Sequence, residues 1–277
     1  MMPKGREPDT APPPVERWHD REAARYDARY RDIPYWRLYN ELTWRTIEGC
    51  LPSRPGAGVL DAGGGTGLWT VKLAERGYKV TLVDISAGML EVAKQKVADK
   101  GLSSLVEIRK MDVCKMDELP DDRYALVVAE GDVLSYCADH DKAVAGFQRV
   151  ACSGAYVLAS VDNKLTTVAR FVREGDIESL DRFLETGIVY EQGGVEPENE
   201  SDFPIKPFAP WELRDIFERH GLVIVRVVGK PVYAGSAANV LESSRGYERL
   251  VALETEFNSK PELLGSAPHI EIVARKP

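Results

Sequence analysis

Short apolar runs alternate with helical patterns through the middle of the chain. The apolar runs predict buried strands that begin at Val59 and span residues 79–85, 105–109, 125–129 and 155–159. Between them, apolar spacing of three and four residues predicts helices over 68–76, from Ser86 onward and over 140–150. Continuous Val-, Leu- and Ala-rich strands separated by helices indicate a parallel sheet covered on both faces. The pattern therefore predicts a doubly wound α/β fold.

Two segments flank this alternation. Residues 15–51 have a helical pattern, and they are unusually aromatic, with Trp18, Tyr26, Tyr30, Tyr35, Trp36, Tyr39 and Trp44. After the fifth strand, residues 164–210 contain a helix at 165–174 and then a stretch rich in Gly, Glu and Pro. Such a segment is too long for an ordinary connection, so we expect a cap that binds substrate.

The C-terminal part completes the pattern less regularly. A helix is expected at 211–220, and two further strands at 223–228 and 270–274. The intervening residues, 231–268, have no readable periodicity. We expect seven strands in one domain that spans residues 1–277.

Composition limits the classes of function. Of the 277 residues, 44% are apolar and 29% are charged, which is typical of a globular protein. The formal net charge of -8 argues against a protein whose affinity comes mainly from nucleic-acid phosphates. No apolar run approaches the roughly 20 residues that span a bilayer, and the polar, Pro-rich start has no signal-peptide core. We expect a cytoplasmic protein that is a monomer or a homodimer. We expect no membrane partner, and the charge disfavours nucleic acid as a partner.

Cysteine and histidine give no metal signature in the sequence. The four cysteines are far apart, without a C-x-x-C pair, at Cys50, Cys114, Cys137 and Cys152. The four histidines are equally scattered, at His19, His140, His220 and His269. We therefore expect reduced thiols and no bound metal.

The strongest chemical signal is a glycine cluster where the first strand meets its helix. It reads Asp61, Ala62, Gly63, Gly64, Gly65, Thr66 and Gly67. Glycines allow positive φ and a close approach of the backbone to a ligand, and this edge of an open α/β sheet is where nucleotides bind. The alternative is a tight turn without a ligand, for which so many glycines would be costly.

The spacing of the loop bears on which nucleotide binds. A dinucleotide fingerprint that starts at Gly63 needs glycine at position 68, where Leu68 stands. The Gly-Lys-Ser/Thr ending of a phosphate-binding loop is also missing. Asp61 would repel a pyrophosphate but suits a ligand with a cationic amino-acid portion. The loop favours a non-phosphorylated adenosyl ligand, and a nicotinamide-dependent oxidoreductase is the weaker alternative.

Two further acids are expected at the same sheet edge. Asp84 ends the second strand, where a carboxylate can accept hydrogen bonds from both ribose hydroxyls. Asp112 is expected to end the third strand and precedes Val113, which suits an adenine edge. One such Asp alone is more often a turn former or a helix cap. Together with Asp61 they indicate a ligand site.

The segments 59–67, 83–86, 89–90, 112–113 and 130–136 together resemble the class I S-adenosylmethionine-dependent methyltransferases. The resemblance is good over residues 59–160, and it extends to subgroups of the glycine N-methyltransferase and ubiquinone/menaquinone methyltransferase types. It implies S-adenosylmethionine as cofactor and a sheet order of 3-2-1-4-5-7-6 with strand 7 antiparallel. It also implies cofactor contacts at Asp61, Ala62, Gly63, Gly65 and Gly67 (methionine portion), Asp84 (ribose), Ile85 and Met89 (adenine faces), Asp112 and Val113 (adenine edge), and Glu130 with Gly131 (main chain).

The N-terminal aromatics add to this resemblance. Tyr26 and the run from Trp36 to Tyr39 are similar to the entry helix of glycine N-methyltransferase-like enzymes, where aromatic side chains close over the cofactor. Aromatic faces suit a cationic sulfonium. In that subgroup the residue at the position of Asp132 faces the methyl acceptor. The alternative is that these aromatics only pack the N-terminal helices on the core.

Methyl transfer from a sulfonium is an in-line displacement, which requires mainly alignment and exclusion of water. A general base is needed only for a protonated acceptor, so no fixed catalytic dyad is expected. The candidates for a base or an orienting group are Asp132, Tyr136, His140 and Asp162. His140 is expected to be solvated, and Asp162 is alternatively a helix cap.

The acceptor is expected under the cap, where Tyr190, Phe203 and Phe208 are candidates for the pocket wall. A cap over a small pocket favours a small-molecule acceptor, because macromolecular substrates need an open, charged groove. A methyltransferase that modifies tRNA or protein and a non-catalytic adenosyl-binding subunit remain as alternatives.

Overall fold

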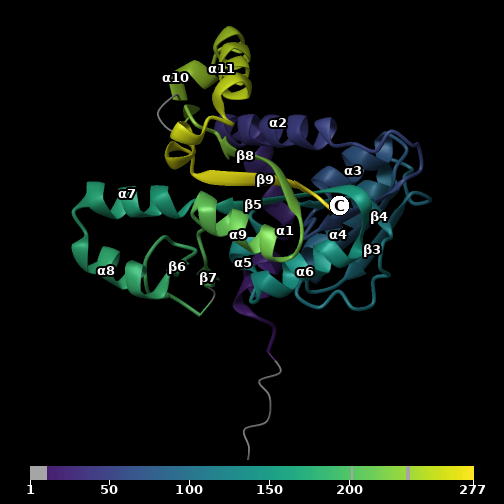
Figure 1. The fold of residues 1–277 in the computed structure, drawn as a ribbon, viewed down its shortest axis with the longest axis horizontal. Coiled ribbons are helices and arrows are strands. Elements are labelled where there is room, and N and C mark those ends of the chain that lie inside the picture. The colour runs from purple at the N-terminus through teal and green to yellow at the C-terminus, as the bar shows by residue number, and fades with distance from the viewer. Residues whose placement is uncertain (1–10, 201, 235–237) are drawn as a thin grey trace, which may run out of the picture.

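A computed structural model describes residues 11–200, 202–234 and 238–277. A seven-stranded sheet runs through the molecule, and helices lie on both of its sides (Figure 1). Residues 1–10, at the polar start of the chain, lie outside the described residues, as do residue 201 of the expected cap and residues 235–237.

The sheet has the expected topology. Its strands are β1 (Gly58–Ala62), β2 (Lys79–Asp84), β3 (Val106–Lys110), β4 (Tyr124–Ala129), β5 (Ala151–Asp162), β8 (Val223–Lys230) and β9 (His269–Arg275). Their spatial order is β3-β2-β1-β4-β5-β9-β8. Strands β1 to β5 pair in parallel, whereas β9 is antiparallel to both β5 and β8. This confirms the order 3-2-1-4-5-7-6, with the last strand of the chain inserted antiparallel.

Two hydrophobic cores cover the two faces of the sheet. Phe147 and Phe217 belong to the core on one face, and Trp44, Trp69 and Leu73 belong to the core on the other. The helices that supply these residues are α2 (Pro34–Gly49), α3 (Leu68–Glu75), α6 (His140–Val150) and α9 (Pro210–Arg219). Burial of both faces of the sheet explains why the strands read as continuous apolar runs.

The aromatic N-terminal section consists of two helices. Helix α1 (Pro14–Asp32) ends where Ile33, with φ −89° and ψ 119°, precedes Pro34, because a residue before proline avoids helical geometry. Helix α1 lies against α4 (Ala87–Asp99). One oxygen of Asp20 accepts hydrogen bonds from the Ser86 hydroxyl at 2.6 Å and from the Gly88 N–H at 2.8 Å. These bonds attach α1 to the edge of the sheet where β2 ends.

The segment after β5 forms a projecting helical hairpin. It contains α7 (Lys164–Glu174), α8 (Ile177–Thr186) and a small antiparallel pair, β6 (Val189–Tyr190) with β7 (Pro204–Ile205). In Figure 1 the hairpin extends to one side of the sheet. Phe171, Phe183 and Val189 form its own small core. Helix α8 was not expected from the sequence.

The unreadable stretch before β9 is also largely helical. It holds α10 (Ala238–Leu241), α11 (Ser244–Phe257) and the 3-10 helix η2 (Pro261–Ser266). Leu250 and Val251 of α11 pack with Leu38 and Leu42 of α2. The remaining helix is the short α5 (Val133–Tyr136). None of the described helices is long and apolar enough to cross a membrane.

Candidate functional site

A cavity of about 560 Å³ lies at the sheet edge where β1, β2 and β4 end. One part of its wall is the glycine loop with the residues after β2, β3 and β4, and the other part comes from α1, α5 and the segment around β7. The lining residues used below are Tyr26, Gly63, Gly65, Asp84, Ile85, Met89, Asp112, Val113, Glu130, Gly131, His19, Tyr39, Val133, Ser135, Tyr136, His140, Phe203 and Lys206.

The glycines of the loop serve different purposes. Gly63 has φ 70°, and a Cβ there would collide with Val133, so packing requires a glycine. Gly65 has φ 52°, and a Cβ there would meet no atom within 4 Å. Gly65 therefore faces open space, as expected of a backbone that a ligand approaches.

Asp61 is buried behind this loop with an incomplete set of partners. Its side chain is 1% exposed, and its Oδ2 accepts a hydrogen bond from the Thr70 hydroxyl at 2.6 Å. Its Oδ1 has no hydrogen-bond partner. Burial raises the pKa of Asp61 to about 7. A buried carboxylate oxygen without a hydrogen-bond donor is costly unless a ligand supplies the donor. The ammonium group of an adenosyl amino acid is such a donor.

Asp84 is held rigidly by the backbone. Its Oδ2 accepts from the Gly65 N–H at 2.8 Å, and its Oδ1 accepts from the Ser86 N–H, also at 2.8 Å. Burial raises its pKa. Each carboxylate oxygen has a further lone pair for a hydroxyl donor. Asp112, which the resemblance implies at the adenine edge, lies two residues beyond the end of β3 rather than on the strand.

Glu130 lines the cavity while its side chain is engaged elsewhere. Its Oε2 is 2.5 Å from Lys230 Nζ, which is also 3.1 Å from Glu271 and 2.8 Å from the Thr43 hydroxyl. The side chains of Glu130, Lys230 and Glu271 are fully buried. Burial, followed by the Glu130 charge, raises the pKa of Glu271 to about 8. The Glu130 side chain is thus committed to Lys230, which leaves its main chain for a ligand.

Four of the residues implied by the resemblance are absent from the described part of the cavity wall, namely Asp61, Ala62, Gly67 and Trp36. Trp36 packs instead on Tyr30, Tyr39 and His269, with ring centroids at 4.9, 5.5 and 5.7 Å. Tyr26 lines the cavity, and its hydroxyl donates to Tyr30 at 3.2 Å. The aromatic section therefore contributes both to the wall and to packing.

An aromatic part of the cavity wall comes from three separate segments. The ring of Phe203 lies 5.9 Å from His19 and 5.4 Å from Tyr136. Of the three aromatics predicted to line the pocket, Phe203 does so, whereas Tyr190 and Phe208 are not among the described lining residues. His19 was missed by the sequence analysis, since only its position in the aromatic helix pointed to it.

His140 and Lys206 add polar groups to the cavity wall. His140 is half-buried against Phe208, at 5.0 Å between ring centroids, so it is only partly solvated. Burial and then the Lys206 charge lower the pKa of His140, which favours a neutral imidazole. The Lys206 N–H donates to the Ser135 carbonyl at 2.8 Å, and this bond fixes the β7 segment on α5.

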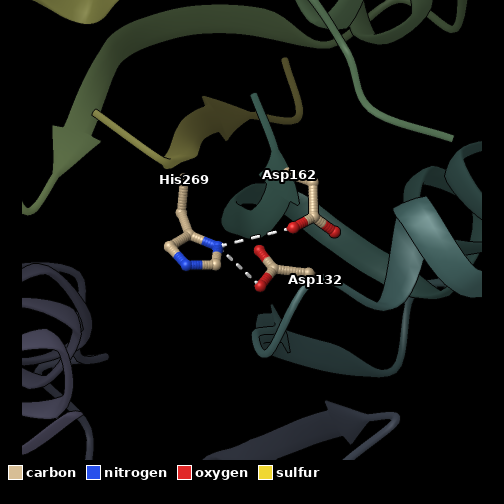
Figure 2. A group of neighbouring side chains, drawn as sticks. All are labelled: Asp132, Asp162 and His269. Atoms are coloured by element: carbon tan, nitrogen blue, oxygen red, sulfur yellow. Dashed lines mark ion pairs between the residues drawn. The ribbon is translucent and has the colours of Figure 1, made fainter. Parts of the chain in front are cut away.

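Asp132 is directed toward a residue that the sequence analysis did not connect with it. Asp132 is 4% exposed, and its Oδ2 lies 2.9 Å from His269 Nδ1, which is 3.9 Å from Asp162 Oδ1 (Figure 2). Burial lowers the pKa of His269, but the Asp132 charge outweighs burial and the net shift is upward. Burial and then the Asp132 charge raise the pKa of Asp162 to about 7. None of the three is among the described wall residues.

Asp162 is not the helix cap that the sequence allowed. The N-cap of α7 is Asn163, whose Oδ1 accepts from the Leu165 N–H at 3.0 Å. The Asp162 side chain is left free of that role and turns toward Asp132 and His269 (Figure 2). No spacing rule could have joined His269 to the two aspartates, because they meet only through the β5–β9 pairing of Asp162 with His269.

Comparison with known proteins identifies the domain. Residues 59–154 match a family model described as a methyltransferase domain. A tRNA 5-carboxymethoxyuridine methyltransferase from Escherichia coli K12 is 27% identical over 223 residues, which cover 79% of this chain and 80% of that protein. A ubiquinone/menaquinone biosynthesis C-methyltransferase from Shewanella piezotolerans is 34% identical over 141 residues, 49% of this chain and 54% of the relative.

Solved structures share the fold over most of the chain. A geranyl diphosphate methyltransferase in complex with GPP and sinefungin has a TM-score of 0.60 at 16% identity, with 87% of this chain and 80% of that chain covered. A methyltransferase from Methanosarcina mazei has a TM-score of 0.58 at 18% identity, with 83% and 96% covered.

The fold and the glycine-loop cavity define a nucleotide-binding α/β enzyme domain. The matched domain and the named relatives make this chain an S-adenosylmethionine-dependent methyltransferase, with S-adenosylmethionine as its cofactor. Its relatives act on different classes of acceptor, as their names show.

Proposed function

We propose that this enzyme transfers the methyl group of S-adenosylmethionine to a small-molecule acceptor. The observation that carries the proposal is the cavity, in which α1 and residues 203–206 lie opposite the glycine loop. Its volume of about 560 Å³ is in the range of small-molecule sites. In this proposal residues 15–51 cover the cofactor, and residues 164–210 form the substrate-binding cap.

The cofactor would bind at the glycine-loop end. The Asp61 carboxylate would receive the ammonium group, Asp84 the ribose hydroxyls, and Ile85 and Met89 the adenine faces. Glu130 and Gly131 would contribute main-chain groups, since the Glu130 side chain is bonded to Lys230. S-adenosylmethionine supplies the methyl group and its sulfur is the leaving group, so these residues need only bind, orient and exclude water.

The acceptor would lie at the aromatic end. His140 is neutral near pH 7 because its pKa is lowered, so its imidazole can accept a proton from an acceptor. Lys206 has no ion-pair partner among the described residues. An unpaired cation on the wall favours an acceptor that carries a negative charge.

The test is a direct assay of S-adenosylhomocysteine release from purified enzyme, with a panel of carboxylate, phosphate, phenol and amine acceptors. We expect turnover with at least one anionic member. Asp84→Ala is the inactive reference, and Asp99→Ala, at the exposed end of α4, is the matched control. Absence of turnover with every small molecule, combined with methylation of tRNA, would reject the proposal.

A tRNA acceptor is the second candidate, because a relative that covers 79% of this chain is a tRNA methyltransferase. Total bacterial tRNA in the same assay tests it. A tRNA substrate should bind with a steep salt dependence, since its phosphates must be neutralised. Salt-independent turnover of a small acceptor favours the first proposal instead.

A further inference from the structure

Three side chains that can ligate a metal meet behind the cavity wall. Asp132 lies just before α5, Asp162 ends β5, and His269 begins β9. One ligand atom from each lies within 4.8 Å of the others. Figure 2 shows both carboxylates turned toward the Nδ1 edge of the His269 ring.

The polar atoms of this cluster do not satisfy one another. Asp132 Oδ1, Asp162 Oδ2 and His269 Nδ1 are buried without a hydrogen-bond partner. His269 Nδ1 forms an ion pair with Asp132 Oδ2 at 2.9 Å, which leaves the second oxygen of Asp132 and Oδ2 of Asp162 without a partner. Buried polar groups are costly unless they are hydrogen-bonded or coordinate a metal. The orphaned Asp132 Oδ1, on a residue only 4% exposed, points to a missing ligand.

The charge of the cluster leads to the same conclusion. Lys230, the nearby buried cation, already contacts Glu130, Glu271 and Thr43. A dication between Asp132 and Asp162, with a neutral imidazole, neutralises both carboxylates at once.

We propose that Asp132, Asp162 and His269 bind one divalent transition-metal ion. Two carboxylate oxygens and one imidazole nitrogen suit Mn²⁺, Fe²⁺ or Zn²⁺, whereas Mg²⁺ and Ca²⁺ prefer oxygen ligands throughout. Three protein ligands leave coordination positions open, which is typical of catalytic metal sites.

The surroundings hold the ligands in place. The Asp132 N–H donates to Ser160 Oγ at 3.0 Å, and the Asp162 N–H donates to Ser135 Oγ at 2.9 Å. Such outer contacts orient metal ligands.

The site adjoins the cavity. Gly131, Val133 and Ser135, which flank Asp132 in sequence, all line its wall. A metal here would place positive charge beside the acceptor end, and this consequence alone rests on the proposed function. Metal binding itself requires neither cofactor nor acceptor.

The experiment uses the full-length enzyme, stripped with EDTA, without cofactor or acceptor. MnCl₂, ZnCl₂ and MgCl₂ are titrated by calorimetry, and bound Mn²⁺ is examined by electron spin echo envelope modulation. We expect one Mn²⁺ or Zn²⁺ per chain, weaker Mg²⁺, and nitrogen coupling from a directly bound imidazole. Asp162→Asn and His269→Gln should each weaken binding by at least about tenfold.

Asp141→Asn is the matched control, because Asp141 and His220 form a second Asp–His pair, at 3.2 Å, away from the cluster. It should bind Mn²⁺ as the unaltered enzyme does. Weak binding without nitrogen coupling, or binding that Asp162→Asn and His269→Gln leave unchanged, would overturn the site. The coupling is measured on the unaltered enzyme, so the test stands even if a variant misfolds. The metal titration and the acceptor assay are separate measurements. Failure of the metal site can therefore be distinguished from failure of the proposed function.

Discussion

The two ends of the cavity are constructed differently. At the cofactor end, the polar groups come from the ends of consecutive strands, and backbone N–H groups hold Asp84 in place. At the acceptor end, His19, Tyr136 and Phe203 come from distant segments and are held by contacts between aromatic rings. The first end is built from backbone geometry and the second from side-chain packing.

This difference should make it possible to alter cofactor binding and acceptor methylation independently. A backbone-built site tolerates little change, because a new Cβ or a lost carboxylate directly alters the space for the ligand. A packed aromatic site can rearrange its side chains while the sheet stays intact. Substitutions at the first end should therefore abolish cofactor binding, and substitutions at the second should affect the acceptor while cofactor affinity is preserved.

The largest effect is expected for Gly65→Val. The new side chain would enter open space at the loop from a backbone with φ 52°. We expect S-adenosylhomocysteine binding to weaken by more than about 100-fold, which is roughly 3 kcal/mol. Calorimetry measures the loss, and far-UV circular dichroism checks folding. Gly101→Val is the control, since Gly101 also has positive φ (67°) and open space but lies away from the cavity. Equal loss in both variants would mean that strain, rather than the ligand site, is responsible.

Asp84→Ala should have the next largest effect. It removes the carboxylate expected to accept charge-assisted hydrogen bonds from the ribose, which weakens S-adenosylhomocysteine binding by about 1–3 kcal/mol. Calorimetric titration against Asp99→Ala provides the comparison. Unchanged affinity in a folded Asp84→Ala protein would remove Asp84 from the site.

Cofactor binding should depend on pH through Asp61. Its pKa in the free protein is raised to about 7, so the carboxyl is largely protonated below that pH. The ligand ammonium favours the ionised form, so binding should release a proton and tighten as the pH rises toward about 7. By the same linkage, the raised pKa stabilises the free protein at low pH, and that contribution is lost as the pH rises through about 7.

Calorimetry in buffers of different ionisation enthalpy counts the released proton. Asp61→Asn should abolish the release and flatten the pH dependence. A proton count of zero below pH 7 in the unaltered enzyme would contradict an ammonium contact at Asp61.

The smallest effect is expected for Lys206→Met at the acceptor end. Loss of one charged contact should raise the KM for an anionic acceptor by about tenfold, equivalent to about 1.4 kcal/mol. S-adenosylhomocysteine affinity should stay the same. Steady-state kinetics with varied acceptor, together with the binding titration, distinguishes the two ends. A parallel loss of cofactor affinity would show that the two ends are not independent.

Much of the fold follows from local sequence. The strand–glycine–helix order over 59–76 and the alternation of strands and helices predicted the doubly wound sheet, and the family resemblance implied its strand order. The helix expected from Ser86 onward has Ser86 as its N-cap, whose Oγ accepts from the Met89 N–H at 3.1 Å. Helices α8 and α11 were missed, although Phe183 of α8 packs on Phe171 and Leu250 of α11 packs on Leu42.

The sequence by itself determined the glycine loop and the strand-end acids of the proposed cofactor site, since these residues act through the backbone that they occupy. Only the tertiary structure decided that His269 meets Asp132 and Asp162, that Trp36 packs rather than lines the cavity, and that His140 is half-buried. Those outcomes depend on which distant side chains come into contact. Such contacts depend on the packing of the whole molecule, which local spacing does not encode.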